Sequence, residues 1–194
     1  FPSCRFAGGK SLIPRRPRLA LTRVVHNMGM GDLARPSVVK DILGRHGIRL
    51  SRSLGQHFLV DGNVLSRILD AAELSGGETA LEIGPGAGTL TEELCRRARR
   101  VVAVEYDRRF LPVLQEALGA PPNLEIVGGD ALRVDLPGLF SPRERVRVVS
   151  NLPYNIATPL LLRLLRELPQ IERMVVMVQR ELADRYTAVP GHPA

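Results

Sequence analysis

The chain has 194 residues and a mass of 21.3 kDa, with 44% hydrophobic and 24% charged residues. This composition excludes wholesale disorder, and two cysteines, Cys4 and Cys95, are too few for a disulfide scaffold or a tetrahedral zinc site. No apolar run approaches the roughly 20 residues that a membrane helix needs.

The net charge of +7 is concentrated near the N-terminus. Residues 1–60 contain 11 Lys or Arg and 2 acidic residues, whereas residues 61–194 contain 16 basic and 18 acidic residues. A basic arm of this kind favours a polyanionic partner, above all nucleic acid, although solvated tails have the same composition. Residues 1–31 are predicted to be a disordered extension or an organellar transit peptide, or sequence upstream of a start at Met28 or Met30.

The predicted elements begin with a helix over 36–43, which Gly44 and Gly47 end, and a second helix follows Asp61 as N-cap. The remaining segments alternate in type along the chain. Strands are predicted at 79–83, 101–105, 124–127, 146–150 and 174–178, and helices at 89–97, 108–118 and 158–167. Short apolar strands separated by helices predict an α/β fold with a parallel sheet covered on both faces.

A glycine-rich run, E-I-G-P-G-A-G at 82–88, lies between a predicted strand and a helix. Glycines there let the backbone approach a ligand, and the helix start presents free N–H groups. A dinucleotide fingerprint needs glycine at position 89, which is Thr89, so the spacing disfavours a nicotinamide cofactor. Glu105 ends the next strand, where an acid in a nucleotide-binding α/β fold accepts hydrogen bonds from ribose hydroxyls.

Two further motifs follow the next two strands. Asp130, in G-G-D-A-L, is a candidate acceptor for an adenine amino group, or an N-cap for a helix starting near Ala131. The run N-L-P-Y at 151–154 supplies an amide acceptor, a stiff turn and an aromatic face on which a base can stack. Because successive strand ends line one crevice in such sheets, the four motifs predict one site.

Together with G-Q-H-F-L at 55–59, G-D-A at 129–131 and N-L-P-Y-N-I-A-T-P at 151–159, these motifs resemble the ribosomal-RNA adenine dimethyltransferase family. The resemblance runs from about Leu50 to Pro193. It implies a Rossmann-like class I methyltransferase sheet and S-adenosyl-L-methionine as cofactor. It also implies dimethylation of the N6 amine of two adjacent adenosines near the 3′ end of small-subunit ribosomal RNA, in ribosome maturation.

The resemblance implies six cofactor-binding residues, which are His57, Leu59, Gly84, Glu105, Asp130 and Asn151. Gly84 is expected against the methionine part, Glu105 at the ribose, Asp130 at the adenine and Asn151 beside the transferring methyl group. His57 stands where many members have Asn, and an imidazole can still donate one hydrogen bond.

Four residues, Asn151, Leu152, Pro153 and Tyr154, are the expected catalytic set, and no metal ligand is expected. The ring of Tyr154 and the main chain of Leu152 are expected to grip the target adenine. Catalysis is expected to be positioning of the amine, because the cofactor brings its own electrophile.

The predicted organisation is a basic extension at 1–31, an entry segment at 32–60 and an S-adenosylmethionine-binding domain at 61–194. This domain is expected to be truncated at the C-terminus, since the family continues with further strands and a small helical domain. The implied partner is ribosomal RNA of the small subunit, and no membrane association is expected. The full-length protein is expected to be a monomer. Its expected location is the cytoplasm, or an organelle if 1–31 is a transit peptide. Rival readings are a large-subunit methyltransferase of the antibiotic-resistance type and a non-catalytic RNA-binding assembly factor.

Overall fold

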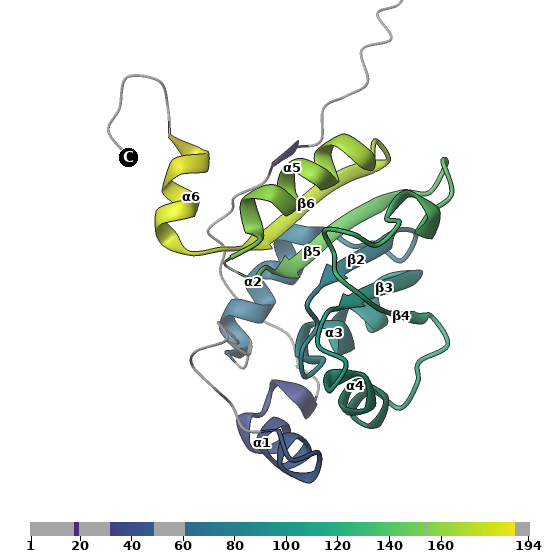
Figure 1. Cartoon of the computed structure of the whole chain (residues 1–194), viewed down its shortest axis with the longest axis vertical. Helices are drawn as coiled ribbons and strands as arrows, with labels where there is room; N and C mark the ends of the chain where they lie inside the picture. The colour runs from purple at the N-terminus through teal and green to yellow at the C-terminus, as the bar shows by residue number, and fades with distance from the viewer. Residues whose placement is uncertain (1–17, 20–31, 49–60, 154, 189–194) are drawn as a thin grey trace, which may run out of the picture.

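A computed structural model describes residues 18–19, 32–48, 61–153 and 155–188, with residues 18, 19 and 32 described by backbone only. Its centre is one parallel sheet with the strand order β1-β6-β5-β2-β3-β4 (Figure 1). The strands are β1 (Arg18–Leu19), β2 (Thr79–Ile83), β3 (Arg100–Glu105), β4 (Leu124–Gly128), β5 (Val146–Asn151) and β6 (Ile171–Met177). The predicted α/β fold with a parallel sheet is confirmed.

Helices connect most of these strands, as the alternating pattern predicted. They are α1 (Pro36–Arg45), α2 (Gly62–Ala72), α3 (Thr89–Arg97), α4 (Phe110–Leu118), α5 (Ala157–Glu167) and α6 (Arg180–Thr187), with 3-10 turns η1 (Asp32–Ala34) and η3 (Pro137–Leu139). The predicted N-cap of α2 is confirmed, because a carboxylate oxygen of Asp61 accepts from the N–H of Asn63 at 2.9 Å.

Several predicted boundaries differ from the structure, by one to three residues, and two of these differences have a clear physical cause. Gly44 does not end the first helix, which continues to Arg45, because the buried residues Val39 and Leu43 hold this helix against its neighbours. The last strand begins at Ile171 rather than at residue 174, since Ile171 and Arg173 pair with Val146 and Arg147 of β5 across an irregularity at Glu172. The polar side chains of Glu172 and Arg173 hid this part of the strand from the apolar pattern.

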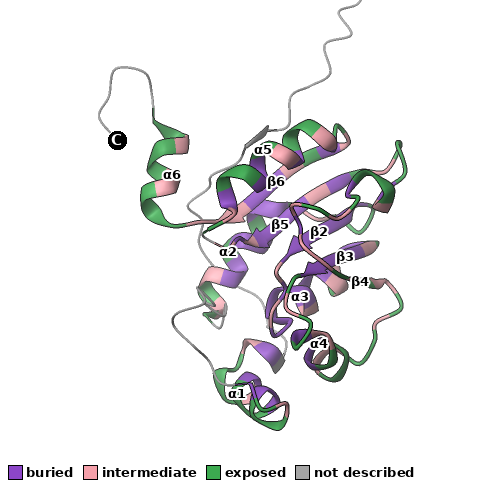
Figure 2. Ribbon diagram, viewed as in Figure 1, coloured by how far each residue is buried: buried purple, intermediate pink, exposed green. Residues whose placement is uncertain are grey.

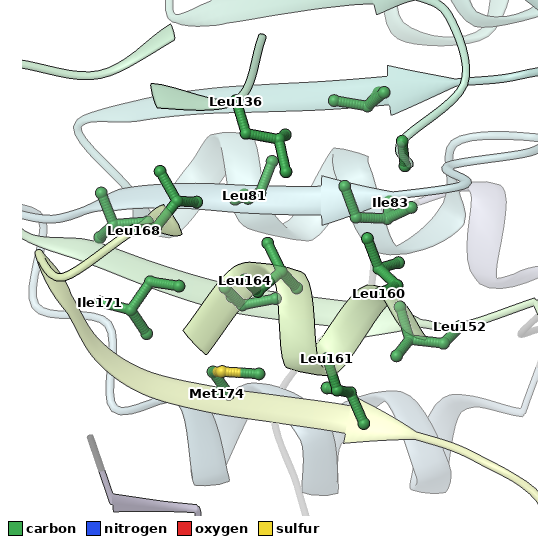
Figure 3. Close-up of a cluster of buried hydrophobic side chains, with 14 of the residues drawn as sticks. Leu81, Ile83, Leu136, Leu152, Leu160, Leu161, Leu164, Leu168, Ile171 and Met174 are labelled. Carbon is green, nitrogen blue, oxygen red and sulfur yellow. The ribbon is translucent and has the colours of Figure 1, made fainter. Parts of the chain in front are cut away.

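The sheet has a hydrophobic core on each face. On one face Leu81 and Ile83 of β2 pack with Leu160 and Leu164 of α5 (Figure 3). On the other face the alternate residues of the strands pack against α2 and α3, in a cluster that contains Ala80, Val149, Leu69, Leu90 and Leu94. Side chains alternate between the faces of a strand, so two helical layers cover the sheet as predicted.

Two helices lie at the periphery. A third cluster joins α1 to α4 through Leu43 and Phe110, below the sheet in Figure 1. The helix α6 has no buried residue and is mostly exposed in Figure 2, and the Tyr186 hydroxyl lies 2.6 Å from the Thr158 hydroxyl on α5. Within the residues that the structure describes, no helix is long and apolar enough to cross a membrane.

Candidate functional site

A cavity of about 930 Å³ opens at the carboxyl ends of β2, β3, β4 and β5. The strand order reverses direction between β2 and β5, and ligands of open α/β sheets bind at such a switch point. Its wall includes the predicted residues Gly84, Glu105, Asp130 and Asn151, together with Leu152 and Pro153. The structure therefore brings the four motifs to one site. His57, Leu59 and Tyr154 lie outside the described residues.

The glycine-rich run forms a tight loop between β2 and α3. Gly84, Gly86 and Gly88 all have positive φ angles, of 71°, 57° and 88°. A Cβ on Gly84 would lie 3.6 Å from Cγ of Pro153, so this glycine is where the loop meets the N-L-P-Y segment. A Cβ on Gly88 would lie 3.2 Å from Cδ2 of Leu114, so the third glycine serves the packing of α3 against α4.

Glu105 holds the end of β3 to the glycine-rich loop. One carboxylate oxygen accepts from the N–H of Gly86 at 3.0 Å, and the other accepts from the N–H of Asp107 at 2.8 Å. The residue is only 6% exposed, and burial raises the pKa of its carboxyl, which the backbone N–H groups of Asp107, Gly86 and Tyr106 oppose. A carboxylate has about four lone-pair sites, so Glu105 can still accept from a ligand and can combine this structural role with the predicted binding role.

Asp130 caps a turn at the end of β4. Its carboxylate accepts from the N–H of Leu132 at 2.9 Å, and its carbonyl accepts from the N–H groups of Arg133 and Val134, both at 2.8 Å. The alternative interpretation of Asp130 as the N-cap of a helix starting near Ala131 is wrong, because the segment is a turn that leads toward η3. From α5, Arg163 donates to the carbonyls of Ala131 at 2.7 Å and Val134 at 2.8 Å, which fixes this turn at the cavity.

The N-L-P-Y segment leaves the sheet at the end of β5. Asn151 is the last strand residue, paired in register with Met177. The N–H of Leu152 donates to the carbonyl of Met177 at 3.0 Å, so this group is engaged within the sheet. The side chain of Leu152 is buried, while Pro153 accepts through its carbonyl from the N–H of Ile156 at 3.2 Å. The segment thus enters the cavity from a rigid support.

One acid of the cavity wall was assigned no role from the sequence. Glu82, in the glycine-rich motif itself, is 2% exposed and lines the cavity. Burial raises the pKa of its carboxyl to about 8, the Glu105 carboxylate adds to the effect and the Thr91 hydroxyl opposes it. The signal was present in the sequence, since Glu82 is the acidic residue of the otherwise apolar strand T-A-L-E-I.

The wall beyond Glu105 also contains residues that the sequence analysis passed over. Tyr106 is 75% exposed, and the guanidinium of Arg109 pairs with the Asp107 carboxylate at 2.5 Å, which lowers the pKa of that carboxyl. These side chains give the mouth of the cavity an aromatic face and an ion pair. Among the described residues, no group of three or more His, Cys, Asp or Glu could hold a metal ion.

The family described as "Ribosomal RNA adenine dimethylase" matches residues 47–194. The chain belongs to this family. It is 48% identical over 164 residues to the ribosomal RNA small subunit methyltransferase A of Geobacillus thermodenitrificans, covering 82% of this chain and 56% of that protein. The family resemblance drawn from the motifs is confirmed.

Solved structures show the same fold. A dimethyladenosine transferase from Plasmodium falciparum has a TM-score of 0.58 at 30% identity, covering 66% of this chain and 46% of that one. The 23S rRNA methyltransferase ErmE has a TM-score of 0.59 at 35% identity, covering 68% and 51%. The predicted class I methyltransferase fold is therefore confirmed. The chain spans a little over half the length of the curated relatives it matches.

Proposed function

We propose that this chain is the cofactor-binding part of an S-adenosylmethionine-dependent ribosomal RNA adenine dimethyltransferase. Its substrate would be the N6 amine of two adjacent adenosines near the 3′ end of small-subunit ribosomal RNA. The observation that supports this most is the meeting of Gly84, Glu105, Asp130 and Asn151, from four strand ends, at one cavity. The names of relatives that are 46–48% identical support the small subunit as the substrate.

The cavity suits a cofactor with a ribose, an adenine and a positively charged methionine part. Its volume of about 930 Å³ is that of a site for a large ligand. Glu105 can still accept from a ribose hydroxyl, and the second carboxylate oxygen of Asp130, which pairs with the exposed Arg133 guanidinium at 3.6 Å, can accept from an adenine amino group. Gly84, with its positive φ and no side chain, leaves room for the methionine part. His57 and Leu59 would add contacts from the entry segment.

The cofactor supplies an activated methyl group on a sulfonium sulfur. The chain's own contribution is to hold the adenine amine in line with that group. The Asn151 amide oxygen and the Leu152 carbonyl would accept the hydrogens of the amine, and Pro153 would keep both acceptors in place. The ring of Tyr154 would stack on the base after the base has left its helix. Because positioning dominates, no side-chain nucleophile is needed.

RNA contact would come from arginines, since the first 60 residues carry a net charge of +9. The organisation as extension, entry segment and methyltransferase domain is part of this proposal. So are the monomeric state of the full-length protein and its cytoplasmic location, with an organelle as the alternative.

A large-subunit methyltransferase is the second candidate, and the likeness to ErmE favours it. Mapping methylated adenosines decides between the two. Small and large ribosomal particles that lack these modifications are incubated with radiolabelled S-adenosylmethionine and a form of the protein extended to the length of its relatives. Dimethyladenosine near the 3′ end of the small-subunit RNA is the expected product. Label in the large subunit would instead favour the resistance-type enzyme, and no label with normal RNA binding would favour an assembly factor.

A substitution pair tests the base-binding part of the proposal. Because stacking uses the ring face, Tyr154→Phe should retain methyl transfer while Tyr154→Ala should lose about 10-fold or more, since base–aromatic stacking is worth roughly 1–3 kcal/mol. An equal loss of methyl transfer in both variants would contradict stacking and would show that the hydroxyl group is required.

A further inference from the structure

Glu82 lies on β2, the strand between those that carry Asn151 and Glu105. Leu81 and Ile83 pack on the α5 side of the sheet, so strand alternation directs Glu82 to the side of α2 and α3 (Figure 3). The residue is 2% exposed and forms part of the cavity wall. Among the described residues, nothing hydrogen-bonds to its Oε2 atom. A buried carboxyl oxygen left over at a cavity wall points to a ligand.

The surroundings of Glu82 hold acids and neutral groups. On β3 it faces Glu105, and on α3 it interacts with the Thr91 hydroxyl, which favours its charged form, and with the Cys95 thiol, which Glu92 also influences. Burial raises the pKa of Cys95 to about 12, so that thiol stays neutral. The neighbouring Ser150 hydroxyl on β5 is bound to the backbone of Ile83. In the described parts of the chain, Glu82 makes no salt bridge, so a basic side chain does not stabilise its charge there.

We propose that Glu82 is a specificity-determining residue that ionises in response to the positive charge of the cofactor and so favours the cofactor over its uncharged-sulfur product. It is a neutral acid when the cavity holds no cation, and it becomes a carboxylate when the sulfonium compound binds. In this step the O–H bond of the carboxyl breaks and the proton passes to solvent through the open cavity. The inference rests on the proposed function, because it requires a sulfonium ligand in this cavity.

The consequence concerns discrimination between cofactor and product. Methyl transfer converts the sulfonium into the neutral thioether of S-adenosylhomocysteine, which keeps the ammonium group but carries one positive charge less, so Glu82 ionises less with the product than with the cofactor. A unit charge several ångströms away in a partly dehydrated site lowers the pKa of a carboxyl by about 1 to 2. From about 8 in the free protein, the pKa of Glu82 would fall into the neutral range when the cofactor binds. The cofactor would then be favoured over the product increasingly as the pH rises.

Calorimetric titration measures this directly. The 194-residue chain is titrated with S-adenosylmethionine and with S-adenosylhomocysteine near pH 7 in phosphate, HEPES and Tris, whose ionisation enthalpies differ. We expect release of about half a proton more for the cofactor than for the product. In Glu82→Gln this difference should vanish, and cofactor affinity near pH 8 should fall about 10-fold while product affinity changes less than about twofold. Glu92→Gln on the neighbouring helix is the matched control and should behave as wild type.

The outcomes separate this inference from the proposed function. Equal proton release for both ligands in the wild-type protein, or an unchanged difference in Glu82→Gln, would overturn the role of Glu82 while cofactor binding itself stands. If neither ligand binds the wild-type chain, the proposed function fails and this inference with it. Should Glu82→Gln not fold, the ratio of the two affinities in wild type between about pH 6 and pH 9 decides, because a ratio independent of pH contradicts the proposal.

Discussion

The hydroxyl of Ser150 bridges the backbone of Ile83 where β2 and β5 stop pairing. It donates to the Ile83 carbonyl at 2.7 Å, and its oxygen accepts from the Ile83 N–H at 3.2 Å. The last ladder pair between the two strands is Leu81 with Val148, so the side chain replaces ladder hydrogen bonds beyond that point. The strands can therefore separate at the switch point, where the cavity opens, without leaving these buried groups unpaired.

Replacing this hydroxyl should destabilise the fold. Ser150→Ala leaves the N–H and carbonyl of Ile83 without their partner, and an unsatisfied buried polar group costs about 1–3 kcal/mol. We expect the free energy of unfolding in urea to fall by about 2 kcal/mol with an unchanged slope. Ser141→Ala, in an exposed turn, should stay within about 0.5 kcal/mol of wild type. A loss no larger than that control would show that the bridge is dispensable.

Removing the charge of Glu105 should affect both binding and stability. A Gln side chain has one acceptor oxygen, so Glu105→Gln cannot accept from Gly86 and Asp107 through separate oxygens as the carboxylate does. Hydrogen bonds to a charged group are worth about 1.5–3 kcal/mol, so cofactor affinity should fall roughly 10- to 100-fold. Calorimetry and thermal melting measure the two effects, and Glu125→Gln on β4 is the exposed control. Wild-type affinity in Glu105→Gln would remove this residue from the site.

The stability contribution of Glu82 should depend on pH. Its pKa in the folded protein, about 8, lies above the ordinary value of 4.5, so the unfolded chain ionises first as the pH rises. Wild type therefore loses stability between about pH 4.5 and pH 8, whereas Glu82→Gln does not ionise. The variant should gain roughly 2–4 kcal/mol relative to wild type between about pH 5 and pH 8, measured by urea unfolding. A difference that is constant with pH would mean that Glu82 is already ionised in the folded protein.

Loss of the Asn151 amide should damage methyl transfer more than folding. The residue ends β5 at the cavity wall, and misplacement of a reacting amine by a small distance can cost about 100-fold in rate. Asn151→Ala is compared with wild type by melting temperature and by methyl incorporation in the extended protein. Asn63→Ala, exposed on α2, is the control with the same chemical change. Normal turnover, or loss of the fold, would each contradict the assigned role.

Arg163 should act on cofactor binding from a distance, because it holds the turn that carries Asp130. Its guanidinium reaches two carbonyls of that turn and is itself paired with Glu167 at 2.8 Å. Arg163→Met should weaken cofactor binding about 5- to 10-fold, and Arg163→Lys should restore little, since an ammonium lacks the fork that reaches two acceptors. Arg166→Met, on the exposed side of α5, should bind as wild type. Full rescue by Lys would indicate that charge alone matters.

The sequence by itself determined the elements whose signals are local. The bounds of β2 and α3 follow from the spacing of their apolar residues and from the glycines that separate the two elements. The N-cap at Asp61 follows from a hydrogen bond between its side chain and the first turn of the helix. The meeting of the four motifs was also predictable, because parallel strands bring their carboxyl ends to one edge. The predicted roles of His57, Leu59 and Tyr154 and the predicted domain boundaries stay predictions.

Only the tertiary structure decided which groups these residues meet. Glu105 is bound to an N–H that is 19 residues away, Arg163 to a carbonyl 32 residues away and Ser150 to a strand 67 residues away. The turn at Asp130, for which a helix start was the alternative prediction, is held by Arg163 as well as by its own cap. Burial of Glu82 likewise depends on α3 packing over β2. Periodicity and capping act within a few residues, whereas hydrogen-bond partners and solvent exclusion exist only once distant segments have packed together.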